Sequence, residues 1–344
     1  MNILICIHSL SGGGAEKQVH LIAGGLSRLN HTVTVLYHEN GPKGDELEFV
    51  DSKVNYIKIP YGHKNPLLIP FLFKYAKKSD IVISWILQMD VLFGFLKQFI
   101  NFKWLFREPN SDYANNTLKY KLRHFFAKKA SGIIANSAAG MQLWEDFLCP
   151  KKVIYNVAYQ GNLLQNTNNK EINFAYVGRF IEQKNVMRLS QVFNLVSKKL
   201  PVKCDFYGKG SDCPVIEWSS SVINNGFISK PDDVFKKVKF FISLSKREGN
   251  PNSVLEAMLE GCLLVLSDIP THREIFSGAP NSNVLFVNLM DSNEVIAANI
   301  IDFYSRVELV NNVDWSPYLS GRENNQVVNE YNNFIIQVSR GDGE

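Results

Sequence analysis

The chain has 344 residues, of which 45% are hydrophobic and 20% are charged, as is ordinary for a globular protein. This length favours two domains, and the apolar content lets each form a core without a disulfide or metal to hold it together. Residues 1–160 hold 19 Lys and Arg against 12 Asp and Glu, a net charge of +7, whereas the remainder carries −3. This asymmetry indicates that the first half faces an anionic partner.

The cysteines and the first residues favour a cytoplasmic protein. The five cysteines are scattered, odd in number and without a CxxC pair, and Cys6, Cys204 and Cys262 lie in or beside apolar runs. Buried reduced thiols of this kind fit a reducing compartment. The apolar start at 1–10 lacks a basic leading region, so we expect a first strand there and no signal peptide. The sequence holds no apolar run long enough to span a bilayer.

Short apolar runs alternate with helical patterns along the first half of the chain. Most runs are continuous rather than alternating, which is typical of parallel strands buried on both faces. Repeated strand–helix–strand units predict a doubly wound sheet. The expected strands are 3–10, 32–38, 54–59, 80–85, 103–108, 132–137 and 153–156, with helices near 15–29, 67–78, 90–100, 113–130 and 138–148.

The same rhythm restarts after a polar segment at 158–170, which is rich in Asn and Gln and is interpreted as a linker. We therefore expect an α/β chain with one domain at 1–158, a second at 171–321, and a last helix at 322–340 that packs back on the first. The expected strands are 172–178, 203–208, 222–228, 239–245, 263–268 and 283–288, with helices at 184–199, 231–237, 252–260 and 291–305.

Ligands of parallel α/β sheets bind beyond the carboxyl ends of the strands, so special residues at those ends are informative. The first such segment is SGGGAEK at 11–17. Gly12, Gly13 and Gly14 allow a tight turn and a close approach of the backbone to an anion at the next helix. Lys17 stands where a dinucleotide fingerprint would have its third glycine, although Glu39 could supply its acidic residue. A plain tight turn explains the glycines equally well.

Two cations follow the first strand of the second domain, in YVGRFIEQKN at 176–185. Arg179 lies just past the strand and Lys184 lies five residues later, at the start of a helix. A guanidinium fork, an ammonium group and a helix N-terminus together could hold a diphosphate. Solvated loop charges are the alternative interpretation.

Two carboxylates, Glu248 and Glu256, lie in the stretch SKREGNPNSVLEAMLEGC at 245–262. Carboxylates near a phosphate site can accept hydrogen bonds from sugar and ribose hydroxyls. The alternative for Glu256 is a capping box with Ser253, and for Glu248 an exposed loop carboxylate.

The segments GGGAEK, VGRFIEQKN, and EGNPNSVLEAMLEG followed by LLVLSDIPTHREI closely resemble the family 4 retaining glycosyltransferases of the GT-B fold. These segments occur in the family's order over nearly the whole chain. The most specific motif is the pair Glu248 and Glu256, which are separated by seven residues. The resemblance implies two Rossmann-like domains facing across a cleft, with an acceptor domain at 1–158 and a nucleotide-sugar donor domain at 171–321.

The resemblance also implies roles for individual residues. Arg179 and Lys184 would hold the donor diphosphate, Glu248 the hydroxyls of the transferred sugar, and Glu256 the ribose. Arg179, Lys184 and Glu248 would form the catalytic set, and Glu248 is not assigned as a nucleophile. Further donor contacts are implied at Gly12, Gly13, Gly14, Gly178, Gly208, Phe227, Ile228, Asn252, Ser253 and Val254.

The acceptor side departs from the family pattern. Many members carry a His where this chain reads WLFREPNSDY, with Arg107 and Glu108 in its place. We expect Arg107, Glu108 and His8 to lie on the acceptor side, although a lone His at a strand end is more often a structural residue.

We expect no cofactor and no metal, because the sequence contains no DxD and no zinc-spaced His or Cys cluster. The expected reaction transfers a sugar, most simply from a UDP-sugar, to a glycan or lipid-linked saccharide in surface polysaccharide biosynthesis. The basic amphipathic segment 117–130 is either an ordinary crossover helix or a peripheral contact with anionic membrane.

Three other functions remain as alternatives. One is a nucleotide-sugar 2-epimerase of the same fold, against which the basic first domain argues. An NAD-dependent oxidoreductase or a non-catalytic nucleotide-binding protein would rest on the glycine loop alone. The basic residues lack a nucleic-acid-binding module around them, so we expect no nucleic-acid partner.

Overall fold

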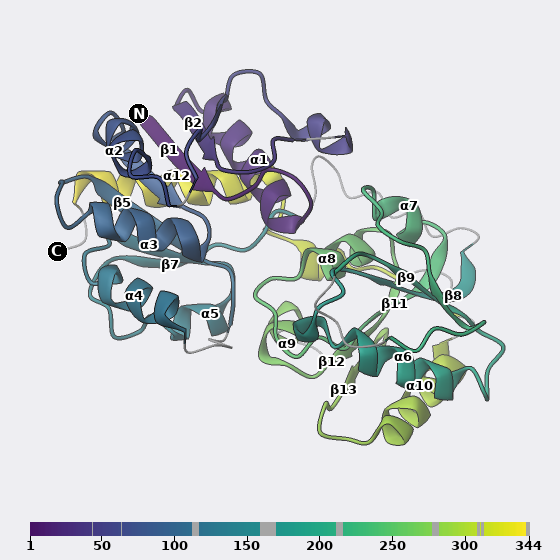
Figure 1. Ribbon diagram of the computed structural model, residues 1–344. Helices are drawn as coiled ribbons and strands as arrows, with labels where there is room; N and C mark the ends of the chain where they lie inside the picture. Colours follow the sequence, from purple (N-terminus) through teal and green to yellow (C-terminus); the bar gives the residue numbers. More distant parts are fainter. Residues whose placement is uncertain are drawn as a thin grey trace. The chain divides into compact units, whose positions relative to one another are not determined.

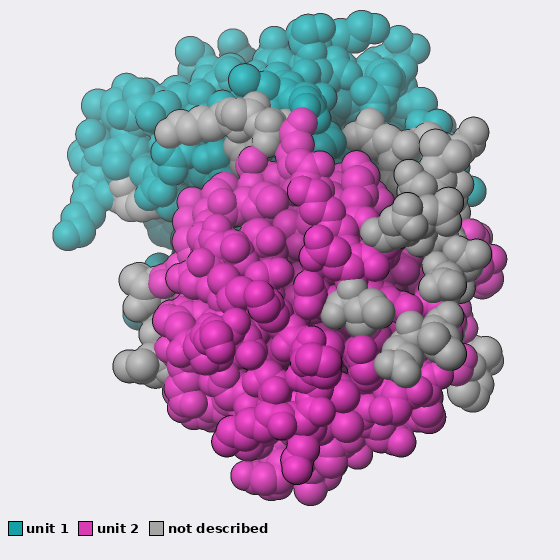
Figure 2. Space-filling view, turned by 90° about the vertical axis from the view of Figure 1, so that its right-hand side faces the viewer, with its two compact units in different colours: residues 1–160, 321–344 teal, residues 161–320 magenta. Residues whose placement is uncertain are grey.

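The computed structural model describes residues 1–341 except 43, 63, 112–116, 159–169, 211–215, 277–281, 308–309 and 311–312. The chain divides into two compact units, which Figures 1 and 2 display. Unit 1 comprises Met1–Gln160 with Gly321–Glu344, and unit 2 comprises Gly161–Ser320. Most of the expected linker, and Cys213, lie outside the described residues.

Unit 1 contains a seven-stranded parallel sheet in the order β3-β2-β1-β4-β5-β6-β7. Six of the seven strands expected in the first half are confirmed, and the seventh, expected at 153–156, lies at Lys151–Val153 instead. Their continuous apolar runs are buried because helices cover both faces. The strands are β1 (Asn2–Ile7), β2 (Thr32–Tyr37), β3 (Asn55–Lys58), β4 (Ile81–Ser84), β5 (Lys103–Glu108), β6 (Gly132–Ala135) and β7 (Lys151–Val153).

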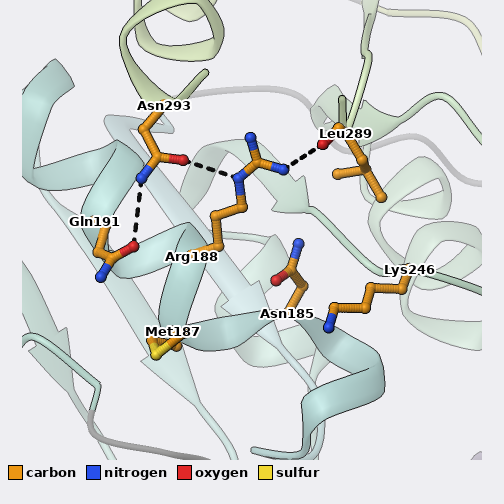
Figure 3. A pocket seen from close by; sticks show the side chains of 7 residues that line it. All are labelled: Asn185, Met187, Arg188, Gln191, Lys246, Leu289 and Asn293. Atoms are coloured by element: carbon orange, nitrogen blue, oxygen red, sulfur yellow. Dashed lines mark hydrogen bonds between the residues drawn. The ribbon is translucent and has the colours of Figure 1, made fainter. Parts of the chain in front are cut away.

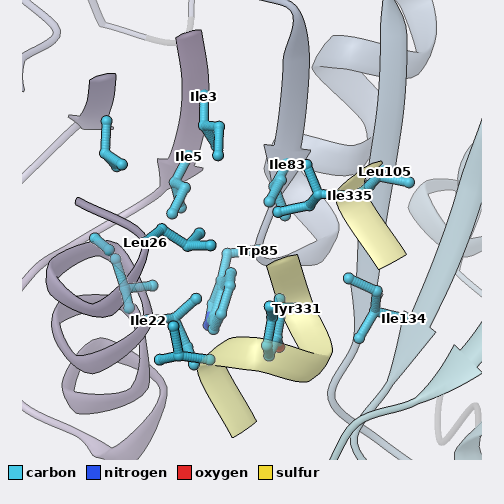
Figure 4. Close-up of a cluster of buried hydrophobic side chains, with 14 of the residues drawn as sticks. Ile3, Ile5, Ile22, Leu26, Ile83, Trp85, Leu105, Ile134, Tyr331 and Ile335 are labelled. Carbon is cyan, nitrogen blue, oxygen red and sulfur yellow. The ribbon is translucent and has the colours of Figure 1, made fainter. Parts of the chain in front are cut away.

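Two hydrophobic clusters flank this sheet. One contains α1 and the last helix, α12, and the other contains the helices α2 to α4. Tyr331 and Ile335 of α12 reach the same cluster as Ile5 and Ile83 of the strands (Figure 4). The helices of unit 1 are η1 (Gly44–Phe49), α1 (Gly14–Arg28), α2 (Leu68–Lys77), α3 (Leu87–Leu96), α4 (Leu118–Ala127), α5 (Ala138–Gln142) and α12 (Asn324–Arg340).

Close packing joins α12 to unit 1 although it is the last element of the chain (Figure 1). A Cβ at Gly25 of α1 would lie 2.2 Å from Val328 Cγ2 of α12, so only glycine permits this approach. The C-terminal helix therefore belongs to the core of the first unit.

Unit 2 contains a six-stranded parallel sheet in the order β10-β9-β8-β11-β12-β13. The six expected strands are confirmed, and the free thiols of Cys204 and Cys262 are buried as predicted. The strands are β8 (Glu171–Val177), β9 (Cys204–Tyr207), β10 (Val222–Asn224), β11 (Val238–Ser243), β12 (Leu263–Ser267) and β13 (Val284–Val287). The helices are η2 (Glu182–Lys184), α6 (Val186–Val196), α7 (Asp232–Phe235), α8 (Asn252–Leu259), α9 (Pro270–Ile275), α10 (Asn293–Val307) and α11 (Ser316–Leu319).

The strand order reverses once in each sheet, between β1 and β4 in unit 1 and between β8 and β11 in unit 2. At such a switch point the connections leave in opposite directions and open a crevice beyond the strand ends. The two switch points therefore mark where ligand-binding residues are expected in each unit.

Several helices differ from the sequence-based expectations. The helix expected at 113–130 is α4, Leu118–Ala127, with 112–116 outside the described residues, and the one expected at 138–148 ends at Gln142. The short helices η1, α9 and α11 were not predicted. Of the residues described, no helix is both long and apolar enough to cross a membrane.

Candidate functional site

One predicted cation and one predicted carboxylate of unit 2, Lys184 and Glu248, meet at its switch point. Arg179 follows β8, Lys184 ends η2, and Glu248 lies in the loop after β11. Lys184 Nζ lies 2.5 Å from Glu248 Oε1, and the two side chains are 16% and 8% exposed. Two residues 64 positions apart thus form one ion pair at the edge where ligands of such sheets bind.

The neighbours of Glu248 keep it ionised although it is buried. Burial raises the pKa of a carboxyl group, but the Lys184 ammonium and a hydrogen bond from Ser245 outweigh it, so the pKa of Glu248 is lowered. The site therefore presents a fixed carboxylate at neutral pH. An exposed loop carboxylate, the alternative interpretation of Glu248, is wrong.

The Arg179 side chain, five residues before Lys184 in the chain, is exposed, while its carbonyl oxygen accepts a hydrogen bond of 2.9 Å from the Tyr176 hydroxyl. The backbone of the loop is therefore fixed and the guanidinium is available to a ligand. An exposed Arg can contact an anion without being pulled out of an internal ion pair.

Three loops lie side by side at the carboxyl ends of β8, β9 and β10. The Gly178 amide donates to Tyr207 O at 3.0 Å, and the Gly208 amide donates to Gly226 O at 2.7 Å. A Cβ at Gly208 would lie 1.9 Å from Gly178 O, so this position requires glycine. The structure thus brings together Gly178 and Gly208, two of the glycines that the resemblance placed along the donor.

Phe227 and Ile228 form the outer part of this set. Phe227 is exposed, Ile228 is half-buried, and Lys209 Nζ lies 4.2 Å from the centre of the Phe227 ring. An exposed aromatic ring at a strand end offers a flat apolar face to a planar ligand.

The N-terminus of α8 follows Glu248 by four residues. The helix begins at Asn252. The first backbone hydrogen bond of this turn is donated by the Leu255 amide to the Pro251 carbonyl oxygen at 3.3 Å. The amides of Asn252, Ser253 and Val254 therefore come before the first hydrogen bond within the helix. Helix N-termini of this kind favour the binding of anions.

The capping box suggested for Ser253 and Glu256 is wrong. Pro251 is the N-cap residue of α8 and its own side chain makes no capping hydrogen bond, so Ser253 is already inside the helix. Glu256 lies one turn further on and is buried at the same edge of unit 2.

A cavity of about 460 Å³ lies beside the site, between α6, the Lys246 loop and the start of α10 (Figure 3). Its described lining includes none of the predicted donor contacts. Arg188 crosses it, donating to Asn293 Oδ1 at 2.8 Å and to Leu289 O at 2.5 Å. These bonds tie α6 to α10, so Arg188 has a structural role that fixes the helix following Lys184.

The glycine loop of unit 1 differs from a simple anion site. Gly12 has φ +105°, which favours glycine, Gly13 is the N-cap of α1, and Gly14 is its first residue. A Cβ at Gly13 would lie 2.8 Å from Glu16 Oε2. The Glu16 carboxylate therefore lies at the N-terminus of α1, where its negative charge interacts favourably with the helix dipole.

His8, His38 and Glu39 form a cluster at the carboxyl ends of β1 and β2. His8 Nε2 lies 3.0 Å from Glu39 Oε1, and the His8 ring stacks on that of His38 with centroids 5.5 Å apart. One ligand atom from each lies within 4.8 Å of the others, so these residues could contact a cation. Sequence spacing missed the cluster because only the pairing of β1 with β2 brings His38 to His8.

Arg107 and Glu108, expected on the acceptor side, are buried in the interior of unit 1. Arg107 Nε donates to the Tyr331 hydroxyl at 3.1 Å. Glu108 accepts hydrogen bonds from Arg123 Nη1 at 2.5 Å and Trp144 Nε1 at 3.1 Å. These contacts fix β5, α4 and α12 to one another, and they give both residues a structural role.

Comparison with known proteins identifies the chain. Residues 171–306 match the family model for glycosyl transferases group 1. The capsular polysaccharide biosynthesis glycosyltransferase CapH of Staphylococcus aureus is 27% identical over 292 residues, which cover 77% of this chain and 81% of that protein. The chain is a glycosyltransferase of the GT-B fold. The predicted fold and the resemblance to family 4 glycosyltransferases are thereby confirmed.

Two solved structures show the same fold at low sequence identity. Anabaena HepE, in complex with UDP and glucose, has a TM-score of 0.76 at 16% identity and covers 98% of this chain and 100% of its own. The pneumococcal O-GlcNAc transferase GtfA, in complex with UDP and GlcNAc, has a TM-score of 0.75 at 12% identity and covers 98% and 99%. The family match of this glycosyltransferase spans the whole site from Arg179 to Glu256.

Proposed function

We propose that this glycosyltransferase transfers a sugar from a UDP-sugar to a glycan or lipid-linked saccharide during surface polysaccharide synthesis, with retention of anomeric configuration. The observation that carries the proposal is the Lys184–Glu248 ion pair at the switch point of unit 2, whose side chains are 16% and 8% exposed; Arg179, exposed, lies five residues before Lys184 in the chain. The similarity to CapH supports the pathway, and the UDP and glucose bound to HepE support the donor class.

The cations would act on the diphosphate. As the bond between the sugar and the phosphate breaks, negative charge develops on the leaving oxygen, and Arg179, Lys184 and the α8 amides would stabilise it. Fixed donors of this kind do not have to reorganise during the reaction. The departing phosphate would take the proton of the acceptor hydroxyl on the same face, so no protein nucleophile is needed.

The carboxylates would hold hydroxyl groups. Glu248 is ionised and fixed by Lys184, so one of its oxygens can accept a bond from the transferred sugar. Glu256, one turn into α8, would accept the bonds of the ribose. Because Lys184 and Arg179 provide the positive charge that a divalent ion supplies elsewhere, we propose that transfer needs no metal.

The first test is a thermal-shift panel with UDP, GDP, ADP, NAD and several UDP-sugars, each with EDTA or magnesium. A ligand that binds the folded state raises the melting temperature by mass action. We expect UDP to give a shift that EDTA leaves unchanged. A shift with NAD alone, or one that requires magnesium, would contradict the proposal. Product analysis with a UDP-sugar and no acceptor separates transfer from epimerisation, since only an epimerase would form the 2-epimer without an acceptor.

For the acceptor side we propose that unit 1 docks peripherally on the inner face of an anionic cytoplasmic membrane. Leu118 and Phe125 of α4 are 71% and 61% exposed, and the lysines at 119, 121, 128 and 129 are exposed beside them. Arg123 lies in the same basic segment, but it does not belong to this surface, because its side chain is buried and ion-paired.

Vesicle co-sedimentation tests the docking. The protein should bind vesicles of phosphatidylcholine with phosphatidylglycerol and not phosphatidylcholine alone, because each surface lysine adds about 1 kcal/mol near anionic lipid. Lys128→Glu with Lys129→Glu should abolish this difference. The matched pair Lys198→Glu with Lys199→Glu, exposed in unit 2, should preserve it. Equal binding to both vesicle types by the native protein would refute the docking.

A further inference from the structure

His272 is a buried group of unit 2 that the proposed mechanism does not use. It is the sole histidine between residues 171 and 321, and it lies in α9 directly after β12. Its side chain is fully buried. A polar ring in such a position needs hydrogen-bond partners, and those partners show what it does.

A chain of hydrogen bonds runs from His272 to the loop that carries Glu248. His272 Nδ1 lies 2.8 Å from Ser267 O and 3.3 Å from Ser267 Oγ. Ser267 Oγ in turn donates to Ser245 O at 2.6 Å, and the Ser245 side chain hydrogen-bonds to the Glu248 carboxylate. All of these residues are buried, so water cannot replace the missing partner if one of them is lost.

The contacts fix which tautomer the neutral ring adopts. A carbonyl oxygen only accepts, so the 2.8 Å contact requires that Nδ1 carries a hydrogen and donates to Ser267 O. The lone pair then lies on Nε2, which is buried and without a hydrogen-bond partner among the described residues. A proton added at Nε2 would therefore be a buried donor with nothing to bind.

The charges around the ring agree with a neutral state. Burial lowers the pKa of His272; Glu248 and Asp268 act in the opposite direction, and Lys184 adds to the lowering. The ring is consequently neutral at pH 7 and takes up a proton as the pH falls below its ordinary value of 6.5. The Lys184–Glu248 pair and His272 are electrostatically coupled.

We propose that His272 is a positioning residue that, through Ser267 and Ser245, holds Glu248 in place to receive the hydroxyls of the donor sugar. The inference deepens the proposed function, because it rests on Glu248 being the residue that contacts the sugar. Neutral His272 fixes the loop by donating from Nδ1. Protonated His272 places a second buried cation near Glu248, competes for its carboxylate and weakens donor binding.

Three variants separate these effects. His272→Asn keeps a donor where Nδ1 stands and removes the titrating group, whereas His272→Leu removes both. Thr271→Val is the matched control, since Thr271 is the preceding buried residue of α9 and its hydroxyl has no hydrogen-bond partner in the described part of the chain. At pH 8 we expect His272→Leu to lower kcat/KM about tenfold, the effect of losing one hydrogen bond. His272→Asn and Thr271→Val should stay within about threefold of native.

The pH profile gives the decisive kinetic readout. The native protein and Thr271→Val should show KM for the donor rising as the pH falls below 6.5, and His272→Asn should lack this acid limb. A purely structural role would lower the melting temperature of His272→Leu, leave its kcat/KM at 20 °C unchanged and leave the acid limb in His272→Asn. That combination would overturn the proposal.

An NMR titration of the ligand-free protein keeps the inference separate from the proposed function. The imidazole signal missing from His272→Asn identifies His272, and Glu248→Gln should lower its pKa because Glu248 raises it. If Glu248→Gln retains full turnover, the proposed function fails whatever the titration shows. If Glu248→Gln is inactive but the His272 titration does not move, this inference fails alone.

Discussion

Replacing Lys184 by Met tests whether the Lys184–Glu248 pair is preformed and buried. Methionine keeps the aliphatic stem and removes the ammonium, so Glu248 stays buried without its partner. Breaking a buried ion pair by removing one member costs about 3–5 kcal/mol. Lys184 keeps 16% of its side chain exposed, and we therefore expect the lower end of this range, about 3 kcal/mol of unfolding free energy.

The pH dependence of this loss has a defined sign. In the native protein the pKa of Glu248 is lowered, so its contribution to stability is present above the unfolded pKa of 4.5 and is lost as the pH falls through the folded pKa. In Lys184→Met burial dominates and raises the pKa of Glu248. The carboxylate then destabilises the fold at neutral pH, and protonation relieves it. The difference between the two proteins should be largest at pH 7 and shrink toward pH 4.

Urea denaturation measures both effects, with Trp218 and Trp315 as the fluorescent reporters of unit 2. In a double-mutant cycle, Lys184→Met should cost less in a Glu248→Gln background, where no charge is left unpaired. Lys246→Met is the control, because Lys246 pairs with Glu182 on the surface and should be replaceable with little effect. An equal cost of Lys184→Met in both backgrounds, or the same cost at pH 4 and pH 7, would refute the buried pair.

Three further predictions follow from single contacts. Glu256→Gln should raise the Kd for UDP at least about tenfold, since a charged hydrogen bond contributes about 1.5–3 kcal/mol; calorimetry that finds an unchanged Kd would remove Glu256 from the site. Gly208→Ala should cost about 1–3 kcal/mol of unfolding free energy and weaken UDP binding, because its Cβ meets Gly178 O at 1.9 Å; Gly62→Ala, with no described atom within 4 Å, should not. Burial, opposed mainly by Arg123, raises the pKa of Asp90 to about 7, so the unfolding free energy of the native protein should fall as the pH rises from about 4 to 7. Asp90→Asn should flatten this pH dependence when urea denaturation is compared at pH 4.5 and 8. An unchanged pH dependence in this variant would contradict the prediction.

The strands could be predicted from the sequence because parallel strands with helices on both faces must be continuously apolar. All of the expected strands are present, and most end within two residues of the expected bounds. Short helices carry too few residues for a periodic signal, which explains why α9 and α11 were missed although each begins with Pro at its first turn.

The site could be predicted as a set of residues but not as a set of contacts. Motif order placed Lys184 and Glu248 in one site, yet nothing in a sequence gives the 2.5 Å between two residues 64 positions apart. His272 left no signal because its function depends on Ser267 and Ser245, which only the pairing of β11 with β12 brings close. The capping box at Ser253 fitted its pattern, but Pro251 is the N-cap.

Arg123 misled the sequence interpretation for a physical reason. It stands in a run of lysines on an amphipathic helix, where a base normally faces water. In the fold its guanidinium pairs with Asp90 at 2.8 Å and Glu108 at 2.5 Å and lies 5.0 Å from the centre of the Trp144 ring. The acids come from other elements, and a sequence does not show which base of a run they select.

Burial and ion pairing alone do not distinguish a scaffold from a reactive site, and the two charge clusters of this glycosyltransferase show what does. In unit 1 the Arg123 fork is 1% exposed between two carboxylates that are also hydrogen-bonded inside the unit, so the cluster is closed to a ligand. In unit 2 Glu248 is buried at the switch point, but its partner Lys184 keeps 16% of its side chain exposed, and α8 begins four residues after Glu248. A ligand that brings phosphate and hydroxyl groups can bind there without breaking the native pair. For that reason we propose that catalysis takes place in unit 2, whereas the buried charges of unit 1 have a structural role.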